Sequence, residues 1–483
     1  MSRAQRFVSW NEQRFGSAKG VRWLLRYVFP DHWSFLLGEV ALYAFIVLVI
    51  TGIFLALFYQ PSDTHMIYHG SYTLLDGQQI SEAYHSVLNL SLTVPAGLLM
   101  RQTHHWAADV FLAAIVLHVM RVFFTGAFRK PRDVNWFVGL TMLMLAIFEG
   151  FAGYSLGDDL MSGMGLAIAY SVAMSVPLIG AQLAHLLWDG SFPGGSDFLP
   201  RLEIAHALLI PAALAGLISV HLALIMRQHH SQFPGRGRKE SNVVGTPMWP
   251  GYALRSIGLL LAVAGILFLL GGLVQINPIW QWGPYEPYLS TNGAQPDWYI
   301  GWLIGALRLM PNFEPTIAGH TPIPNPFWGG VAFPGVVFTI LFFWPAAERR
   351  FSGDRRRHDL LDRPRDKPQR TALGAALLSW VVLIFAVGAA DRVSFRLNIS
   401  YAAQIHVWRV GVWVVPVVVY LLSLSAARAL QRSGAHPLRG SPRVRLRRRP
   451  SGEFELVDAG SPSPEIHERS GGHGERRCER TTE

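Results

Sequence analysis

The sequence predicts an all-α polytopic membrane protein with eight transmembrane helices, the first four of which form a bundle. Three observations predict this class. Of the 483 residues, 51% are hydrophobic and 15% are charged, whereas soluble chains carry about 25% charged residues. Glycine, proline and tryptophan are abundant, which is typical of transmembrane helices and their interfaces. Several apolar runs reach the roughly 20 residues that a helix needs to cross a bilayer.

The candidate spans are eight apolar runs. They cover approximately residues 34–59, 105–127, 134–157, 204–226, 256–276, 327–347, 371–391 and 405–427. The basic segment before the first run is followed by an apolar stretch that is too long for a signal-peptide core, so we expect no cleavable signal peptide. The single cysteine, Cys478, excludes a disulfide scaffold, a covalent Cys-x-x-Cys-His haem attachment, an iron–sulfur cluster and a cysteine zinc site within this chain.

Basic residues alternate between the loops. Lys and Arg gather after the second, fourth and sixth spans, whereas loop 60–100 has none and loop 158–203 carries Arg201 with four aspartates. By the positive-inside rule we expect a multi-pass protein of the cell (plasma) membrane with both termini cytoplasmic. The short loop with Arg392 and Arg396 fits this rule less well. The net charge of +10 therefore requires no nucleic-acid partner.

We divide the chain into four segments. These are a cytoplasmic N-terminal segment (1–33), the four-helix bundle (34–230), a second part with the remaining helices (231–430) and a disordered basic cytoplasmic tail (431–483). A solvated tail is the favoured interpretation, and contact with anionic membrane lipid is the alternative. The two long outer loops contain amphipathic stretches, so we expect short surface helices there that form a pocket.

Four histidines lie deep in the apolar spans. His104 and His118 stand 14 residues apart in the second span, and His206 and His221 stand 15 residues apart in the fourth. Because an α-helix turns about 100° and rises about 1.5 Å per residue, each pair lies near one face of its helix, about 21 Å apart along the axis. If the two helices run parallel and face each other, the imidazoles form two facing pairs. Each pair can then hold a haem iron from both sides, so the bundle would hold two non-covalent haems b.

Other interpretations of these histidines stay open. Hydrogen bonding to neighbouring helices, or a proton relay, would account for a single intramembrane histidine. Two pairs at matched intervals favour haem ligation instead. His105 is a competing ligand, and we choose His104 because its interval to His118 keeps both side chains on one face.

Glycines repeat the same interval in the flanking spans. Gly38 and Gly52 are 14 residues apart in the first span, as are Gly139 and Gly153 in the third. Glycine lets a bulky planar group approach a helix backbone, so we expect these glycines to flank the haems. Packing of small residues between helices is the alternative.

Two arginines stand one turn from the histidines. Arg101 precedes His104 by three residues, and Arg121 follows His118 by three. Arginine forms bidentate, charge-assisted bonds with carboxylates, which suits haem propionates. Interfacial snorkelling explains the two positions equally well.

Longer motifs surround these residues. They are RQTHHWAADVFLAAIVLHVMR, GAFRKPRDVNW, GFAGYSL, MSGMG, RLEIAH with PAALAGLISVH, and QPDWYIGWLIGALRLMP. Over about residues 20–430 the chain resembles cytochrome b of the quinol:cytochrome c oxidoreductases (bc complexes), and the last motif resembles the PEWY motif of that family with Asp in place of Glu. The 15-residue interval, HHSQFPGRGRKESNVVG and the PDWY form look most like the branch of actinobacterial respiratory chains, which use menaquinol.

The resemblance implies the cytochrome b subunit of quinol–cytochrome-c reductase, which works by a Q cycle. Quinol is oxidised near the outer face, one electron passes to a Rieske iron–sulfur subunit, and the other crosses two haems b to a quinone at the inner face, with proton translocation. His104 and His206 would hold the outer haem, and His118 and His221 the inner one. The implied partners are the Rieske subunit, a cytochrome c subunit and a second copy of the complex, with a terminal oxidase as a candidate further partner.

The resemblance also implies a quinol pocket on the outer side. Its catalytic residues would be Asp297, Tyr299 and Tyr154, and its wall would be Met161, Gly165 and Pro296. Quinol oxidation needs a base that releases protons outward, and a partly desolvated carboxylate with a raised pKa would serve. A role as helix N-cap is the alternative for Asp297.

The chain departs from the family pattern at two places. Gly157 stands where the family usually has proline, in the turn beside the outer pocket. The Lys-Asp pair expected at the start of the fifth span reads Arg255-Ser256, so the acidic proton donor is absent there. His230, Arg227 and Arg255 are the candidates for the inner quinone site.

Two alternative functions are kept. One is a divergent dihaem electron carrier without a working Rieske partner. The other is a polytopic proton-coupled transporter, which gives no reason for the matched histidine intervals.

Overall fold

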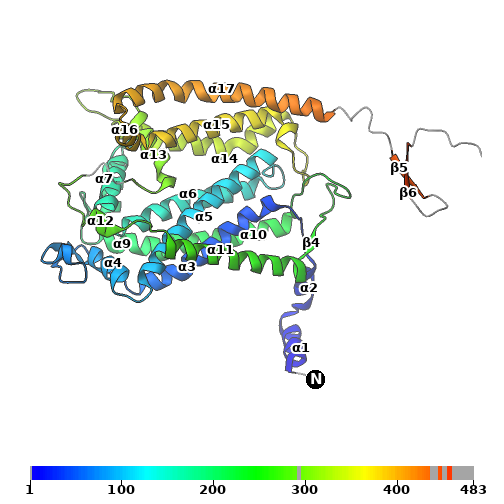
Figure 1. Ribbon diagram of the computed structural model, residues 1–483, viewed down its shortest axis with the longest axis horizontal. Coiled ribbons are helices and arrows are strands. Elements are labelled where there is room, and N and C mark those ends of the chain that lie inside the picture. Colours follow the sequence, from blue (N-terminus) through cyan, green and yellow to red (C-terminus); the bar gives the residue numbers. More distant parts are fainter. Residues whose placement is uncertain (1–2, 291–294, 436–443, 449–453, 459–483) are drawn as a thin grey trace, which may run out of the picture. The chain divides into compact units, whose positions relative to one another are not determined.

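The computed structural model describes residues 3–290, 295–435, 444–448 and 454–458. The chain divides into two compact units, Met1–Arg428 and Ala429–Glu483. Eight helices in the described part are long and apolar enough to cross a membrane, and each corresponds to one predicted span. They run over Trp33–Ala56, Gly97–Thr125, Asp133–Ser155, Phe198–Gln228, Met248–Leu273, Trp328–Ser352, Pro368–Val387 and Tyr401–Ser433. The predicted all-α polytopic fold is thereby confirmed (Figure 1).

The spans and the shorter elements carry the labels of Figure 1. The spans contain α3 (Leu36–Ala56), α5 (Gly97–Thr125), α6 (Asp133–Ser155), α9 (Phe198–Ile204), η3 (Ala205–Leu209), α10 (Ile210–Gln228), η4 (Met248–Tyr252), α11 (Ala253–Leu273), η5 (Trp328–Ala332), α14 (Phe333–Ser352), α15 (Pro368–Val387) and α17 (Tyr401–Ala435). Shorter helices are α1 (Arg3–Phe15), α2 (Ala18–Arg26), α4 (Glu82–Leu92), α7 (Leu160–Met174), α8 (Gly180–Trp188), α12 (Ile279–Trp282), α13 (Trp298–Leu309) and α16 (Ala390–Leu397).

The two long outer loops contain the short helices that their amphipathic sequences predicted. The loop after α6 holds α7 and α8, and the loop after α11 holds α12 and α13. Two pairs of short antiparallel strands fasten other loops: β1 (Val28–Phe29) pairs with β4 (Thr246–Pro247), and β2 (His65–Ile67) pairs with β3 (Gln79–Ser81).

The first four spans form the predicted bundle. α3 packs on α5, α5 on α6 and α6 on α10, and η3 contacts α3 to close the ring. Small side chains such as Ala44, Ala107 and Ala146 are fully or almost fully buried at these contacts. Small residues let helix backbones approach closely. Such close packing favours helix association in a bilayer, where lipid tails are as apolar as the side chains and no hydrophobic effect drives the helices together.

The later spans pack around this bundle. α11 lies on α3 and α5, where the backbone of Gly271 meets Thr103. α13 lies on α15, where Gly305 meets the Ile384 carbonyl, and α14 contacts α6. A side chain at either glycine would collide with the neighbouring backbone, so glycine sets both helix separations.

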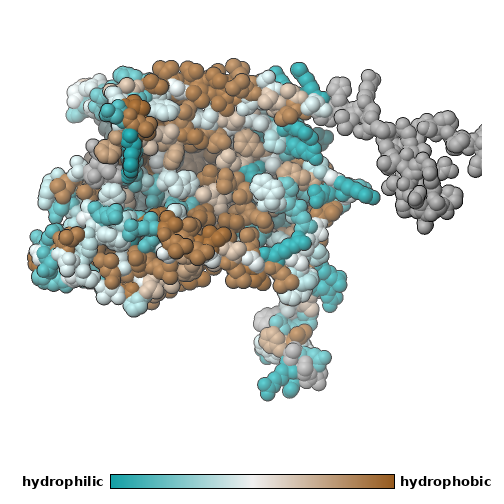
Figure 2. Space-filling view, viewed as in Figure 1, coloured by the Kyte–Doolittle hydropathy of each residue, from teal (hydrophilic) through white to brown (hydrophobic). Residues whose placement is uncertain are grey.

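Loops that are distant in sequence meet at two ends of the unit Met1–Arg428. At the end here called the acidic end, the Tyr285 amide donates to the Asp158 carbonyl, and the Ser81 hydroxyl donates to the Asp158 carboxylate. At the other, here called the basic end, the Arg132 guanidinium donates to the His229 carbonyl and to the Asp359 carboxylate. The basic end thus joins the three loops that the charge pattern assigns to the cytoplasm. Apolar side chains cover the helix flanks (Figure 2).

The unit Ala429–Glu483 contains an antiparallel strand pair within the predicted tail. β5 (Val444–Arg448) pairs with β6 (Phe454–Asp458), with Val444 opposite Asp458. The sequence did not predict these strands. The rest of the predicted disordered tail after Ala435 lies outside the described residues.

Candidate functional site

The four span histidines form two facing pairs between α5 and the span that contains η3 and α10. The ring centroids of His104 and His206 lie 6.1 Å apart, and those of His118 and His221 lie 6.4 Å apart. Two imidazole–metal bonds of about 2 Å, in line on opposite sides of one ion, separate the ring centres by roughly 6 Å. The spacing of each pair would therefore fit one metal ion held between the two rings.

A π-helical turn accounts for the unequal intervals in the two helices. His206 lies in η3, where the hydrogen bonding is of the π type, between the α-helical segments α9 and α10. A π turn holds one more residue than an α turn, and such turns often occur at functional sites. The π turn accommodates the extra residue. His206 and His221, 15 residues apart, can therefore face His104 and His118, which are 14 residues apart in α5.

Each of the four predicted glycines lies beside one of the four histidines. A Cβ atom at Gly52 would lie 3.2 Å from His104 Cε1, and one at Gly153 would lie 2.6 Å from His206 Cε1. Hydrogen at these positions leaves the histidine rings and a flat group between them room against the helix backbone. The interpretation as packing of small residues between helices does not account for contact with these particular rings.

The basic-end pair has the same neighbours. A Cβ atom at Gly38 would lie 3.2 Å from His118 Cε1, and one at Gly139 would lie 3.8 Å from His221 Cε1. The rings thus stand between α3 and α6 at both levels of the bundle, as the shared interval predicted.

The arginines near the histidines keep buried nitrogen atoms without partners. In Arg101 the Nε and Nη2 atoms are buried and unpaired, and only Nη1 donates, to the Asn277 carbonyl at 3.0 Å. In Arg121 the Nε and Nη2 atoms are likewise buried and unpaired. Because buried donors are nearly always satisfied, each guanidinium is suited to an anionic partner such as a propionate. The donor set therefore fits two haems b, each with a histidine pair and an arginine.

Other side chains orient the histidines at the acidic end. His104 Nδ1 lies 2.9 Å from the Thr51 hydroxyl, which itself donates to the Val47 carbonyl. That bond leaves His104 Nε2 for a metal, as is usual for ligating histidines. Glu149 Oε1 lies 2.9 Å from His206 Nδ1, but the angle is unsuitable for a hydrogen bond. The sequence did not predict either neighbour.

His105 points away from the pair formed by its neighbour. Its Nε2 atom lies 2.8 Å from Asp297 Oδ1, across 192 positions of sequence, and both side chains are largely buried. The Tyr299 hydroxyl donates to Asp297 Oδ2 at 2.8 Å. Asp297 occupies the N-cap position of α13 but makes no capping hydrogen bond. The N-cap alternative therefore does not explain this carboxylate.

The pKa of Asp297 differs from the predicted direction. Burial acts to raise this pKa, but the His105 imidazole and the Tyr299 hydroxyl outweigh burial and lower it. The same carboxylate and burial raise the pKa of the Tyr299 hydroxyl. The expectation of a raised pKa at Asp297 was wrong, because the contact with His105 could not be predicted from the sequence. Asp297 is ionised at neutral pH and can accept a proton.

The predicted pocket wall lies around this carboxylate. The Tyr154 hydroxyl packs on Gly165, where a Cβ atom would lie 2.1 Å from its oxygen, and the Tyr299 ring packs on Gly150. Met161 is buried, and Pro296 is partly buried beside Asp297. The structure thus brings Tyr154 of α6 onto Gly165 of α7, and Tyr299 of α13 onto Gly150 of α6.

Two aspartates at the acidic end, Asp159 buried and Asp158 partly buried, were not predicted as site residues. Asp159 caps α7 by accepting from the Met161 amide, and Asp158 accepts from Ser81. Burial raises the pKa of each carboxyl to about 6. Asp109, one turn after His105 in α5, also has a buried oxygen without a partner.

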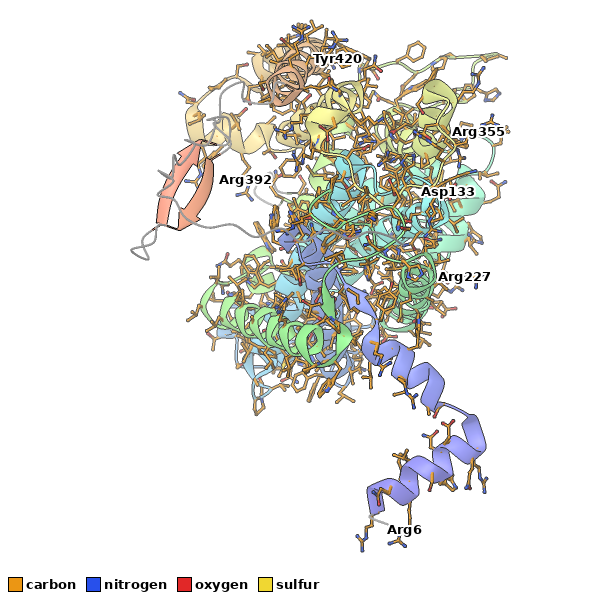
Figure 3. All side chains as sticks on the ribbon, turned by 90° about the vertical axis from the view of Figure 1, so that its right-hand side faces the viewer. Arg6, Asp133, Arg227, Arg355, Arg392 and Tyr420 are labelled. Carbon is orange, nitrogen blue, oxygen red and sulfur yellow. The ribbon has the colours of Figure 1, made fainter. Side chains whose placement is uncertain are left out.

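The three candidates for the inner quinone site do not form one cluster. His230 Nε2 is buried without a partner, and its ring lies 4.8 Å from that of Phe29. Arg255 pairs with Asp31, and both side chains are more than half exposed. Arg227 is exposed at the end of α10 and is seen at the edge of the molecule in Figure 3.

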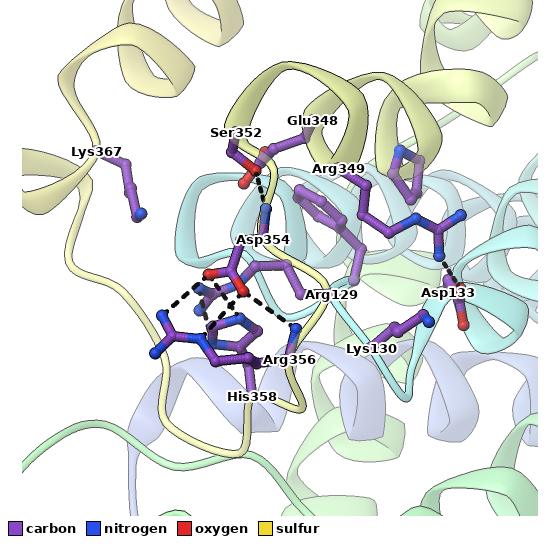
Figure 4. A pocket seen from close by; sticks show the side chains of 12 residues that line it. Arg129, Lys130, Asp133, Glu348, Arg349, Ser352, Asp354, Arg356, His358 and Lys367 are labelled. Atoms are coloured by element: carbon purple, nitrogen blue, oxygen red, sulfur yellow. Dashed lines mark hydrogen bonds and ion pairs between the residues drawn. The ribbon is translucent and has the colours of Figure 1, made fainter.

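A separate polar pocket opens at the basic end (Figure 4). Its walls come from the loop between α5 and α6, the end of α14 and the loop that follows. Arg349 pairs with Asp133 at 2.6 Å, and His358 pairs with Asp354 at 3.1 Å. None of its lining residues is a predicted haem or quinone residue. The first pair joins the end of α14 to the start of α6, and the second lies within the loop that follows α14.

The fold and site define a class: a polytopic helical membrane protein with two buried histidine pairs, one above the other in a single bundle. The family model described as cytochrome b(N-terminal)/b6/petB matches residues 109–284. The chain is 45% identical to the cytochrome bc1 complex cytochrome b subunit of Mycobacterium leprae, over 87% of this chain and 76% of the relative. It is 42% identical to the subunit of the same name from Streptomyces coelicolor, over 96% and 85%.

The chain belongs to the cytochrome b subunits of cytochrome bc1 complexes, which are the cytochrome b components of quinol–cytochrome-c reductase. It is an integral membrane protein of respiratory electron transport, in a family that binds haem b and quinone. A solved structure titled "Hyperthermophilic respiratory Complex III" has a similar fold, with a TM-score of 0.62 at 20% identity over 88% of this chain and 100% of that one. This family membership excludes the alternative function of a proton-coupled transporter.

Proposed function

We propose that this chain carries electrons between two quinone sites in a Q cycle. The observation that supports this most is the presence of two facing histidine pairs with the spacing of axial ligands. Two haems b held by His104 with His206, and by His118 with His221, would carry single electrons from the acidic end to the basic end. Arg101 and Arg121 would bind their propionates.

The residues of the acidic end are proposed to oxidise quinol. Asp297 is ionised because of its bonds to His105 and Tyr299, so it can accept a hydroxyl proton as the electrons leave. Tyr299 fixes the second carboxylate oxygen. The proposed wall, which excludes water from the ring, consists of Tyr154, Met161, Gly165 and Pro296. One electron would pass to a Rieske subunit and the other along the bundle.

The partners follow from the same proposal. We propose a Rieske iron–sulfur subunit, a cytochrome c subunit and a second copy of the complex, with a terminal oxidase as a further candidate. Menaquinone is the proposed quinone, because the relatives named above come from actinobacteria. The acidic end would face outward from the cell membrane and the basic end, with both termini, the cytoplasm. The four-segment division of the chain is kept as part of this proposal.

The test uses the purified complex with Asp297→Asn, which keeps the shape of the side chain but removes the base. Loss of a positioned general base lowers rates by about 10²–10⁴-fold, so we expect quinol-dependent cytochrome c reduction to fall at least about 100-fold. Asp197→Asn is the matched control, because Asp197 is an exposed aspartate of the same face. Equal rates for the Asp297 variant and the control would contradict the proposal.

A second candidate function is favoured by the missing acid at Ser256. A dihaem carrier without a working Rieske partner would accept electrons from quinol without supporting cytochrome c reduction. Haem reduction by quinol in the purified complex, with no electron reaching cytochrome c, would support this alternative.

A further inference from the structure

The basic end lacks the acid that the family resemblance leads one to expect. Reduction of a quinone to quinol takes up two electrons and two protons, one proton on each carbonyl oxygen. Ser256 stands where the resemblance predicts the acid, and a serine hydroxyl does not ionise at neutral pH. A quinone site at this end therefore needs a proton donor from another part of the chain.

Glu39 of α3 supplies a carboxyl group at this position. The Ser256 hydroxyl donates to Glu39 Oε2 at 3.0 Å, and the Tyr252 hydroxyl donates to Glu39 Oε1 at 2.8 Å. Tyr43 also hydrogen-bonds to both Glu39 and Ser256. The Glu39 carboxyl thus links α3 to η4 and α11 through hydrogen bonds. One of its partners is Ser256, which stands at the position of the expected acid.

Glu39 follows in sequence a residue that contacts the basic-end histidine pair. The preceding residue, Gly38, contacts the His118 ring: a Cβ atom at Gly38 would lie 3.2 Å from His118 Cε1. On the other side, the Tyr252 ring stacks on Phe29 at 3.8 Å, and the Phe29 ring lies 4.8 Å from that of His230. Glu39 and the unpartnered His230 Nε2 therefore border the same aromatic cluster.

The other candidates, His230 and Arg255, do not hydrogen-bond to Ser256. Burial, with the nearby Arg132 and Arg121, lowers the pKa of His230 to about 4. The neutral imidazole can hydrogen-bond to a carbonyl oxygen of the quinone at neutral pH. Arg255 is paired with Asp31 at an exposed position. The Glu39 carboxyl is partly buried and is the candidate that hydrogen-bonds to Ser256 and Tyr252.

We propose that Glu39 is the proton donor to quinone at the basic end, in place of the acid missing at Ser256. This inference rests on the proposed Q cycle, which delivers two electrons, one at a time, through the site of His118 and His221. Glu39 takes a proton from water of the basic end through the Tyr252 and Ser256 hydroxyls, gives it to one carbonyl oxygen and takes up another by the same route. It then gives the second proton, so that one quinone, two electrons and two protons form one quinol.

The test compares three variants in the purified complex. Glu39→Gln keeps the shape and loses the acid, Glu39→Gln with Ser256→Asp returns an acid to the other helix, and Asp31→Asn is the control at the same end. Oxidation of the inner haem by added menaquinone is followed in a stopped-flow spectrometer. We expect Glu39→Gln to slow this step by about 100-fold, the double variant to recover most of the rate, and the control to match the wild type.

A second measurement does not depend on turnover. The infrared difference spectrum of menaquinone binding should contain a carboxyl band that shifts in Glu39→Asp and disappears in Glu39→Gln. A wild-type rate in Glu39→Gln, or a carboxyl band unchanged in it, would overturn the inference. Both outcomes leave quinol oxidation at Asp297 intact, whereas failure of the proposed function would abolish haem reduction in the wild type as well.

Discussion

The acidic and basic ends of the bundle have similar histidines, glycines and arginines but different carboxyl groups. Each end has a histidine pair, two glycines and a buried arginine with unpaired nitrogen atoms. At the acidic end the carboxylate is Asp297, which is bound by His105 and Tyr299 within a family motif. At the basic end the carboxyl is Glu39, which is bound by hydroxyl groups from two other elements. The arrangement proposed to hold haem is repeated at both ends, whereas the carboxyl group proposed to transfer protons differs.

The largest effect is expected from single-residue deletions in the two ligand-bearing helices. Deletion of Ala113 from α5 shortens the interval from His104 to His118 to 13 residues, which rotates one ligand by about 100°. Deletion of Ala207 from η3 shortens the other interval from 15 to 14 and converts the π turn to a regular α turn. We therefore expect loss of one haem in the first variant and retention of both in the second, measured by pyridine haemochrome assay. Equal haem loss in both variants would refute the role given to the π turn.

A smaller effect should distinguish the glycines of the two ends. A Cβ atom at Gly153 would lie 2.6 Å from His206, whereas one at Gly139 would lie 3.8 Å from His221, which is an ordinary contact. Overpacking forces neighbours to move at a cost of about 1–3 kcal/mol. We expect Gly153→Ala to remove a large part of the acidic-end haem and Gly139→Ala to leave the basic-end haem near its full content. Optical spectra at low temperature would separate the two, and the reverse ranking would count against the geometry.

The smallest effect concerns Asp158, a partly buried aspartate of the acidic end. Burial raises the pKa of Asp158 to about 6, so the native state holds this proton more tightly than the unfolded state. The resulting stability is fully present below about pH 4 and is lost as the pH rises through 6, by about 3 kcal/mol. Asp158→Asn preserves the left-handed backbone, at φ 46°, and an acceptor for Ser81. The thermal midpoint of the variant should vary less between pH 4 and 7, and identical slopes would exclude this source of pH dependence.

The helices and the histidine pairs were predictable, because each depends on short-range periodicity. Apolar runs located all eight spans, and the shared 14-residue interval located the glycines beside the histidines. Some start positions were wrong by several residues: α5 begins at Gly97, and Arg101 lies inside it. A search for runs of apolar residues does not detect the polar residues at the ends of a helix.

Contacts between distant parts of the chain were not predictable in the same way. The bond from His105 to Asp297 joins residues 192 positions apart, and the bond from Ser256 to Glu39 joins residues 217 apart. The π turn at η3 is a change of hydrogen-bond register, and the spacing alone showed only an unexplained extra residue. The direction of the Asp297 pKa depended on the first of these contacts, so the sequence-based expectation failed there.

The central claim is that two histidine pairs hold two haems b at separate levels of one bundle. The most direct measurement combines a pyridine haemochrome assay with a stepwise redox titration of the purified complex and of His104→Ala and His206→Ala. The account predicts two haems b per chain with separable midpoints, and loss of the same, lower-potential step in both variants. A complex that contains no haem b, or variants in which both steps survive, would contradict it.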